Sequence, residues 1–517
     1  MRALTLGLPL AYFAARIVAV GLEQRDTINP DAVAYLRNAL YWTQGRFADA
    51  IAGYWSPMLS WCVAPGIALG FDALHAAYAV VALWGAALVV LAWTAMRRLT
   101  ALPWWLETAA MLLVADATLI WSATAFPDVI LATGLMAFTV VLWSRGFLDR
   151  RGLQVLAGAC GALAYLGKAY GFPFFLLWCP LSIAWRARDR SRALAAWAFA
   201  MLGFAIVAGP WCAALSLKYG HPTYGLVGGV NRAITGPDPL DSRQMWTPVP
   251  GRVTVWETPE VLAYRPWSPF DSVAMMRHQL SYSWRIAKEV VGSLARFDLL
   301  GLSVGLTLLA PFLAYALGDK EAANRLAWIA GTVVLYSAPF VLVYFTYRYT
   351  APYLRPLCIL ACIQAACTLA CHLPRLVGTA LLGGVLLSFA AHANLPFRPH
   401  VVEETGVSPF NDITVDGKLH RHAAAKLREL GLTGPIASNL YWGGMYVGYF
   451  MDTPFVGTPD APTPEGRNAQ LREHGAKLLL IDRSAPDAAA WASDPAWRLA
   501  TTLTPASGET IDVYALK

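Results

Sequence analysis

Four charged side chains stand where long apolar runs of this chain end, and together they could perform group transfer at a membrane surface. Asp31 lies in "INPDAVAYL", Asp128 in "SATAFPDVILA", Lys168 in "YLGKAYGFPFF" and Arg348 in "YFTYRYTAPYLRP". A carboxylate can take a proton from an attacking hydroxyl, and Lys and Arg can stabilise a departing phosphate. A second carboxylate can orient the acceptor or hold a divalent cation. These residue types suit transfer of a sugar from a lipid phosphate to a hydroxyl.

Each of these residues also has a simpler structural explanation. Asn29 can cap a helix in which Asp31 occupies the first turn, where the helix dipole favours a carboxylate, and Asp128 follows a proline in a similar way. Lys168 could extend its amine to the lipid headgroups. Arg348, between two tyrosines, could be an interface anchor. The presence of two carboxylates and two cations on one membrane face favours a functional role.

The composition places the chain in a membrane. Of its 517 residues, 57% are hydrophobic and 14% are charged, with a mean hydropathy of +0.46, whereas soluble proteins carry about 25% charged residues. The net charge of +7 falls in short clusters between apolar runs, so it indicates topology rather than nucleic-acid binding. Eleven runs approach the length of about 20 residues that a membrane span needs. They lie near 4–22, 74–96, 104–123, 128–144, 153–168, 172–185, 193–215, 298–317, 326–345, 353–372 and 376–393.

The basic clusters predict one orientation of these spans. If the N-terminus is cytoplasmic, alternate loops fall inside, and each of them is short and basic, as the positive-inside rule requires. These loops carry Arg97 and Arg98; Arg145, Arg150 and Arg151; Arg186, Arg188, Arg190 and Arg192; Lys320 and Arg325; and Arg375. The outer face then receives the four charged residues named above and all the long polar segments.

The polar segments predict how the outer face is built. Segment 23–73 contains "DAVAYLRNALYWTQG" and "PMLSWCVAPGIALGFD", which are typical of interfacial amphipathic helices. Loop 216–297, rich in Pro, Trp and Arg, is expected to form a cap. After residue 416, "PIAS", "KLLLID", "RLATTL" and "TIDVYAL" read as strands and accompany two helices. We expect a polytopic α-helical membrane domain at 1–395 and a small extracytoplasmic α/β domain at 396–517.

Other polar residues are assigned structural roles. A charge inside a span costs about 2.5 kcal/mol or more, so Arg16 is expected to pair with Asp116 or Glu107. Most cysteines lie within or beside apolar runs, which predicts small buried thiols rather than a disulfide framework. Four residues of loop 216–297 are expected to be ordinary solvated side chains: His221, His278, Glu257 and Glu260.

The order of the motifs resembles that of GT-C fold glycosyltransferases, especially bacterial members of the protein O-mannosyltransferase and aminoarabinose-transferase superfamily. "DAVAYL" followed by "GYWSPMLSWCVAP" looks like their first external acidic motif, and "FPDVILA" is similar to their second. "YLGKAYGFPFF" resembles their L-x-K-x-x-x-x-P segment and "YRYTAPYLRP" their R-Y-x-x-P segment. The resemblance covers most of residues 1–395 in order.

This resemblance implies an inverting transfer from a polyprenyl-phosphate sugar to a glycan, lipid or protein acceptor at the periplasmic face of a bacterial inner membrane. Asp31 would be the catalytic base, Asp128 the second catalytic carboxylate, and Lys168 and Arg348 the donor-phosphate ligands. Many relatives have Asp-Glu where this chain has Asp31-Ala32, so an obligatory metal is not expected, although Asp128 could bind Mg²⁺ or Mn²⁺. The residues expected to line the substrate site are Tyr35, Trp55, Tyr347 and Tyr349.

Three other functions are compatible with parts of the sequence. A transporter or flippase of lipid-linked glycans also needs many spans, but such proteins often show two related halves, and none are evident here. A scaffold would leave the outer-face charges unexplained. An O-antigen ligase or polymerase shares the donor class, but its long Arg- and His-rich loop usually lies between late spans, whereas loop 216–297 lies mid-chain.

Overall fold

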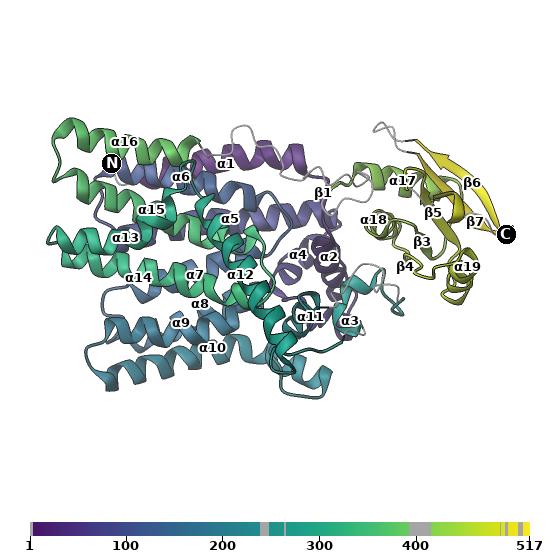
Figure 1. Cartoon of the computed structure of the whole chain (residues 1–517), viewed down its shortest axis with the longest axis horizontal. Helices are drawn as coiled ribbons and strands as arrows, with labels where there is room; N and C mark the ends of the chain where they lie inside the picture. Colours follow the sequence, from purple (N-terminus) through teal and green to yellow (C-terminus); the bar gives the residue numbers. More distant parts are fainter. Residues whose placement is uncertain are drawn as a thin grey trace.

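The computed structural model describes residues 4–237, 248–262, 265–391, 415–485, 488–491, 495–504 and 510–517. Figure 1 shows a bundle of long helices with a smaller sheet region at one end, formed by the C-terminal residues. The short helices α2 (Pro30–Thr43), α3 (Phe47–Ala50), α4 (Met58–Ala68) and α11 (Val227–Ile234) lie at that same end of the bundle. The chain is therefore a mainly helical protein with its irregular segments gathered at one end.

Each of the eleven apolar runs expected to span the membrane coincides with a helix. These helices are α1 (Leu4–Gln24), α5 (Ala73–Leu99), α6 (Trp104–Ser122), α7 (Asp128–Leu142), α8 (Arg151–Gly167), α9 (Gly171–Arg186), α10 (Arg190–Tyr219), α13 (Leu302–Ala316), α14 (Lys320–Ser337), α15 (Ala351–Ala370) and α16 (Arg375–Ala391). Within the described residues, six helical segments are long and apolar enough to cross a membrane, and α14 reaches that length together with the following 3-10 helix η4 (Ala338–Leu342). The polytopic helical class is confirmed, while the total of eleven spans stays a prediction.

Burial separates central helices from peripheral ones. In the most apolar stretch of α15, 78% of residues are buried, whereas only 22% are buried in α1. Almost every residue of α7 is buried as well. Helices that are apolar on all sides belong in the interior of a bundle. Helices α7 and α15, which lead away from the Asp128 and Arg348 motifs, are thus held on all sides.

Glycines allow helix α8 to approach its neighbours closely. A Cβ atom on Gly158 of α8 would lie 1.7 Å from the backbone oxygen of Ala200 in α10, and one on Gly203 of α10 would lie 2.0 Å from the oxygen of Val155 in α8. On the other side, a Cβ on Gly134 of α7 would clash with Ala164 of α8. Small residues at such crossings let backbones pack directly, so α8 is fixed between α7 and α10.

The polar segments form helices more extensively than a simple cap would. The two stretches of segment 23–73 expected to be helical form α2 and α4. Loop 216–297 contains α11, the 3-10 helices η2 (Val255–Glu257) and η3 (Pro259–Val261), and the 23-residue helix α12 (Val273–Ala295). Figure 1 shows α12 lying obliquely across the bundle, and His278 in its second turn contacts the carbonyl of Thr235 at the end of α11. The sequence reasoning did not identify α12.

The C-terminal residues form a mixed sheet with strand order β4-β3-β5-β7-β6. Strands β4 (Phe455–Gly457), β3 (Ile436–Ser438) and β5 (Leu478–Asp482) are parallel, whereas β7 (Ile511–Leu516) runs antiparallel to β5 and to β6 (Trp497–Leu503). The helices of this region are α17 (Lys418–Glu429), α18 (Tyr441–Met451), α19 (Pro464–Glu473) and α20 (Ala488–Trp491). The four strands and two helices predicted here are present, and β4, α18 and α20 are additional.

A two-residue pairing joins this region to the start of the chain. Strand β2 (Val415–Asp416) pairs antiparallel with β1 (Thr27–Ile28), which directly precedes α2. The backbone N–H of Gly417 also donates to the carbonyl of Asp26 at 2.8 Å. The predicted domain boundary at residue 396 lies outside the described residues, so it stays a prediction.

Asp116, one of the two residues expected to pair with Arg16, has a hydrogen-bond partner inside the bundle. Asp116 of α6 is buried and accepts a hydrogen bond from the hydroxyl of Tyr12 in α1, at 2.7 Å. Arg16 lies one helical turn further along α1.

All eight cysteine residues carry free thiols.

Candidate active site

Helix α2 places Asp31 at the end of the bundle that faces the sheet region. The Oδ1 atom of Asn29 accepts a hydrogen bond from the backbone N–H of Ala32 at 2.9 Å, so Asn29 caps the helix as its sequence position predicts. Pro30 occupies the first helical position, and Asp31 falls in the first turn. The cap fixes where the helix begins and therefore where Asp31 lies, and the helix dipole favours the negative charge of its carboxylate.

Asp31 forms an ion pair with Arg348 across most of the chain. The Nη2 atom of Arg348 donates to Oδ2 of Asp31 at 2.5 Å, and both side chains are only about one-fifth exposed, at 20% and 18%. Arg348 lies in the 3-10 helix η5 (Tyr347–Tyr349), just before the central helix α15. Its guanidinium also lies 4.0 Å from the ring centroid of Phe126. A motif near residue 30 and another near residue 348 thus meet at one point.

The other two charged residues form a second pair. Lys168, the residue after the last turn of α8, donates from Nζ to Oδ1 of Asp128, the first residue of α7. Asp128 is 3% exposed, and its Oδ2 atom is buried without a hydrogen-bond partner among the described residues. Leaving a buried acceptor unpaired costs about 1–3 kcal/mol. One oxygen of the Asp128 carboxylate thus has unused hydrogen-bonding capacity among the described residues.

Tyr349 lies between the two pairs. Its ring centroid is 3.8 Å from Nζ of Lys168 and 5.6 Å from Cζ of Arg348, so one aromatic ring contacts both cations. The carbonyl of Tyr349 accepts a hydrogen bond from the hydroxyl of Tyr336 at 2.9 Å, which anchors η5 to α14. The two carboxylates and two cations therefore form one cluster around Tyr349.

Burial and charge shift the ionisation of this cluster. Burial lowers the pKa of Lys168, in the turn after α8, to about 8, although the neighbouring Asp128 carboxylate opposes the shift. Burial also raises the pKa of Tyr35 well above its ordinary value, and the charges of Asp31 and Asp128 add to that effect. Lys168 can thus change its charge near physiological pH, whereas Tyr35 stays neutral.

The residues expected to line the site fall into two groups. The rings of Tyr35 and Trp55 are nearly buried, pack edge to face at 5.1 Å, and lie beside Asp31 on or next to α2. Tyr349 lies within the charged cluster. Tyr347 instead packs against Trp121 at 5.7 Å and Phe297 at 6.1 Å, on the other side of η5. The structure thus brings three of the four aromatic residues toward the charges.

The expectation of solvated side chains in loop 216–297 is wrong for Glu257. Its carboxylate is fully buried and accepts hydrogen bonds from Tyr41 and from the backbone. Glu260 is half-buried and accepts from Tyr219 at 2.5 Å. A sequence signal existed: "TVWE" has the Thr-x-x-Glu spacing of a capping box, which Thr254 and Glu257 form around η2. Phe126, two residues before Asp128, was also missed.

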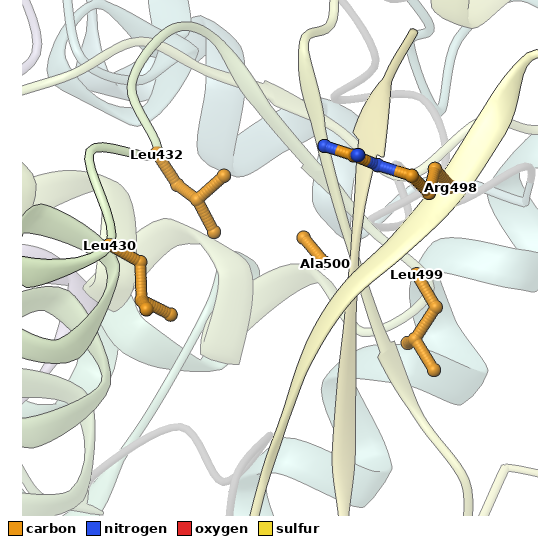
Figure 2. A pocket seen from close by; sticks show the side chains of 5 residues that line it. All are labelled: Leu430, Leu432, Arg498, Leu499 and Ala500. Carbon is orange, nitrogen blue, oxygen red and sulfur yellow. The ribbon is translucent and has the colours of Figure 1, made fainter.

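The hollow found on the C-terminal region contains none of the four residues Asp31, Asp128, Lys168 and Arg348. It is lined by Leu430, Leu432, Arg498, Leu499 and Ala500 (Figure 2). Within the described residues, no group of three or more His, Cys, Asp or Glu side chains is arranged to hold a metal ion.

Comparison with solved structures identifies the fold. No protein-family profile and no curated protein matches the sequence. The crystal structure of ArnT from Cupriavidus metallidurans bound to undecaprenyl phosphate aligns with a TM-score of 0.52 at 13% identity, covering 97% of both chains. The apo form of that ArnT gives 0.53 at 15% identity, again covering 97% of both chains.

Two further glycosyltransferases align over nearly all of this chain. The Archaeoglobus fulgidus oligosaccharyltransferase tethered with an acceptor peptide gives a TM-score of 0.53 at 11% identity, covering 95% of this chain and 71% of that one. The arabinofuranosyltransferase AftD from Mycobacteria gives 0.53 at 14% identity, covering 98% of this chain and 40% of that one. The chain therefore has the GT-C fold shared by these membrane glycosyltransferases, as its motifs predicted.

Proposed function

We propose that this protein is an integral membrane glycosyltransferase that moves a sugar from a polyprenyl-phosphate donor to an acceptor hydroxyl with inversion at the anomeric carbon. The observation that carries the proposal is the convergence of Asp31, Arg348, Asp128 and Lys168 around Tyr349. The GT-C fold supports it, since the ArnT that aligns over the full chain was crystallised with undecaprenyl phosphate.

The chemical step uses Asp31 as general base. Its carboxylate takes the proton of the acceptor hydroxyl while the hydroxyl oxygen attacks the anomeric carbon of the sugar. The bond from that carbon to the phosphate oxygen breaks, and the electron pair leaves with the polyprenyl phosphate. Arg348 and Lys168 stabilise the departing phosphate through charge-assisted hydrogen bonds. Since Arg348 contacts Asp31 directly, the donor phosphate competes with Asp31 for this guanidinium and releases the base for catalysis.

Asp128 acts as the second carboxylate. Its Oδ1 atom holds Lys168, and its buried Oδ2 atom accepts a hydrogen bond from a sugar hydroxyl, which removes the cost of an unpaired buried acceptor. Asp128 would also supply one ligand to a divalent cation, Mg²⁺ or Mn²⁺. No step described above depends on such a metal.

The proposed location is the inner membrane of a bacterium, with the site on the periplasmic side. The N-terminus and the C-terminal sheet lie at opposite ends of the helical bundle (Figure 1). The basic loops predicted to be cytoplasmic connect the helix ends remote from Asp31, whereas α2 lies near the sheet. The positive-inside rule then assigns the sheet region and the candidate site to the outer face.

A transfer assay tests the proposal. Purified wild-type protein is incubated with a panel of radiolabelled polyprenyl-phosphate pentoses, hexoses and aminosugars and with glycan, lipid and protein acceptor fractions. We expect transfer from at least one donor, loss of transfer in Asp31→Asn, and retained transfer in the matched control Asp149→Asn, whose side chain is 67% exposed. Wild-type transfer that is unchanged in Asp31→Asn would exclude Asp31 as the base.

The same assay addresses the metal. Treatment with EDTA, followed by separate return of Mg²⁺ or Mn²⁺, shows whether transfer depends on a divalent cation. Activity that is lost and then restored by one metal would show that transfer needs a divalent cation, for which Asp128 is the proposed ligand, whereas full activity in EDTA would exclude that requirement.

A further inference from the structure

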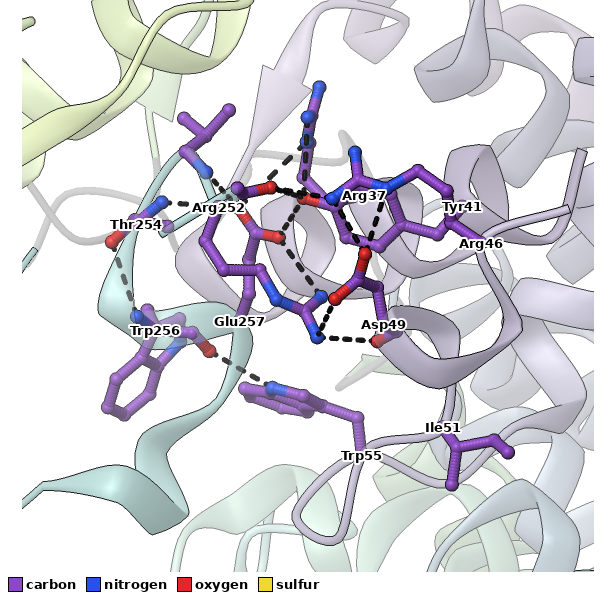
Figure 3. Close-up of polar contacts among 12 residues, drawn as sticks. Arg37, Tyr41, Arg46, Asp49, Ile51, Trp55, Arg252, Thr254, Trp256 and Glu257 are labelled. Atoms are coloured by element: carbon purple, nitrogen blue, oxygen red, sulfur yellow. Dashed lines mark hydrogen bonds and ion pairs between the residues drawn. The ribbon is translucent and has the colours of Figure 1, made fainter. Parts of the chain in front are cut away.

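A buried carboxylate fixes the loop segment that runs from Arg252 to Glu260. Glu257 is fully buried and accepts hydrogen bonds from Tyr41 at 2.6 Å and from the backbone N–H groups of Val253 and Thr254 at 2.7 and 3.1 Å. Figure 3 shows these contacts together with the guanidinium of Arg252, which lies 3.5 Å from the carboxylate. The Glu257 carboxylate thus binds both Tyr41 of helix α2 and the backbone of residues 253–254. Several contacts therefore fix the conformation of this segment.

The same segment holds residues 53–55 at two points. The Oε1 atom of Glu260 accepts a hydrogen bond from the backbone N–H of Gly53 at 3.0 Å. The carbonyl of Trp256 accepts one from Nε1 of Trp55 at 3.0 Å, a contact also visible in Figure 3. The loop from 252 to 260 therefore sets the position of Tyr54 and Trp55.

Tyr54, Trp55 and Trp256 form an aromatic cluster next to the base. Trp55 packs on Tyr54 at 4.5 Å and on Tyr35 at 5.1 Å, and Tyr35 follows Asp31 by one helical turn. Trp256 lies 5.9 Å from Trp55 and 6.1 Å from Tyr54. The cluster thus extends from the helix that carries Asp31 to the loop.

Trp256 has the features of a ligand-contacting residue. It is half-buried, and its Nε1 atom is buried without a hydrogen-bond partner in the described part of the chain. Indole N–H groups usually find a partner when buried. The accessible part of the half-buried indole would contact the apolar C–H face of a sugar ring.

The C-terminal region contacts both the loop segment from 252 to 260 and helix α2. Arg37 of α2 pairs with Asp452 at 2.5 Å, and the N–H of Phe455 donates to the carbonyl of Val253 at 2.6 Å. Trp442 of α18 packs edge to face on Trp256 at 5.9 Å. The aromatic cluster therefore depends on parts of the chain that are far apart in sequence.

We propose that Tyr54, Trp55 and Trp256 form the subsite that binds the acceptor as a carbohydrate, and that Glu257 and Glu260 are its positioning residues. The subsite rests on the proposed function, because it assigns the substrate class on the acceptor side of the same reaction. The two cations Lys168 and Arg348 attract the donor phosphate, whereas this cluster presents neutral aromatic rings beside Asp31. Such rings stack on the C–H face of a sugar rather than on an anionic group.

Saturation-transfer NMR measures this binding without requiring catalysis. The full-length protein in detergent is mixed with a panel of methyl pentosides and methyl hexosides as probes. We expect saturation transfer to the ring C–H protons of at least one glycoside, reduced about tenfold in Trp256→Ala and unchanged in the control Trp284→Ala, whose side chain is 69% exposed on α12. No transfer to any probe, or equal transfer in Trp256→Ala, would overturn the proposal.

Enzyme kinetics distinguish positioning from a general structural defect. In Glu257→Gln and Glu260→Gln we expect the acceptor KM to rise several-fold while the donor KM stays constant, with the exposed Glu289→Gln as control. A parallel rise in donor KM, or no change in acceptor KM, would contradict a positioning role. Glycoside binding without sugar transfer in the wild type would support the subsite and refute the glycosyltransferase proposal, so the two failures are distinguishable.

Discussion

Two charged clusters adjoin helix α2, and they differ in how fully their groups are satisfied. Around Tyr349, Asp31, Arg348 and Lys168 keep about one-fifth of their side-chain surface exposed, and Asp128 has an oxygen without a partner in the described residues. Around Glu257, the carboxylate is fully buried and accepts three hydrogen bonds. The first cluster retains hydrogen-bonding capacity that a ligand could use, whereas the hydrogen bonds of the second cluster all hold parts of the chain together. Variants in the two clusters should therefore fail in different ways.

Asp31→Asn is expected to show the largest effect on activity. Losing the proposed general base should lower kcat by about 10²- to 10⁴-fold, while the asparagine keeps a hydrogen-bond acceptor for Arg348. Transfer assays and thermal unfolding in detergent, measured on the same preparation, test both parts. A large loss of thermal stability would mean that Asp31, like Glu257, mainly stabilises the fold, and the proposed difference between the two clusters would be wrong.

Glu257→Ala is expected to show the opposite pattern. It removes the shared partner of Arg37 and Arg252, which are 7% and 6% exposed, and breaking a buried ion pair costs about 3–5 kcal/mol. The temperature of thermal unfolding should fall markedly below that of wild type, and the loss should be smaller in Glu257→Gln. An unchanged unfolding temperature would show that the remaining contacts of Arg37 and Arg252 suffice.

Lys168 should make donor binding depend on pH. Because its pKa is lowered to about 8 by burial, the amine is charged below that pH and loses its charge as the pH rises above it. We expect the donor KM to increase several-fold between pH 7 and pH 9. In Lys168→Arg, whose guanidinium stays charged over this range, the profile should be flat. The same increase in Lys168→Arg would assign the titration to another group.

Arg421→Gln tests a charged contact outside both clusters. Arg421 of α17 contacts Asp72 at 2.9 Å, and both side chains are about one-third exposed. Exposed ion pairs contribute about 1 kcal/mol or less, but Arg421 binds Asp72 through two nitrogens and also lies 3.5 Å from Asp26. We therefore expect a small loss of stability, below that of Glu257→Ala, and transfer close to wild type. A loss as large as that of Glu257→Ala would mean that the attachment of the C-terminal region depends on this pair.

The sequence predicted those features that follow from local pattern and sidedness. Apolar runs located the long helices, alternating residues located the strands, and the order of basic loops grouped Asp31, Asp128, Lys168 and Arg348 at one end. The sequence could not show which charges pair, since Asp31 meets Arg348 only after η5 and α15 are placed. It also could not separate Tyr347 from Tyr349, because a 3-10 helix has three residues per turn and residues two apart therefore point in different directions.

Other failures came from weak local signals. Helix α18 has the sequence "YWGGMYVGYFM", in which glycine disfavours a helix and aromatics favour a strand, so tertiary packing decides its structure. Strand β4 has only three residues, and one of them is a glycine, a residue type that is depleted in strands. The burial of Glu257 depends on Tyr41 and Arg252 from different segments, which no local window contains.

The pairing of β1 with β2 affects how the protein is made. Residues 27–28 leave the ribosome early, but their strand partner at 415–416 emerges only after every long helix has been synthesised. The start of α2 is thus held by a piece of chain that is translated after all the long helices. A nascent chain that stalls before this point would carry all its long helices yet lack the strand pairing beside Asp31, so the end of the bundle that carries Asp31 cannot be completed until residues 415–416 have been synthesised.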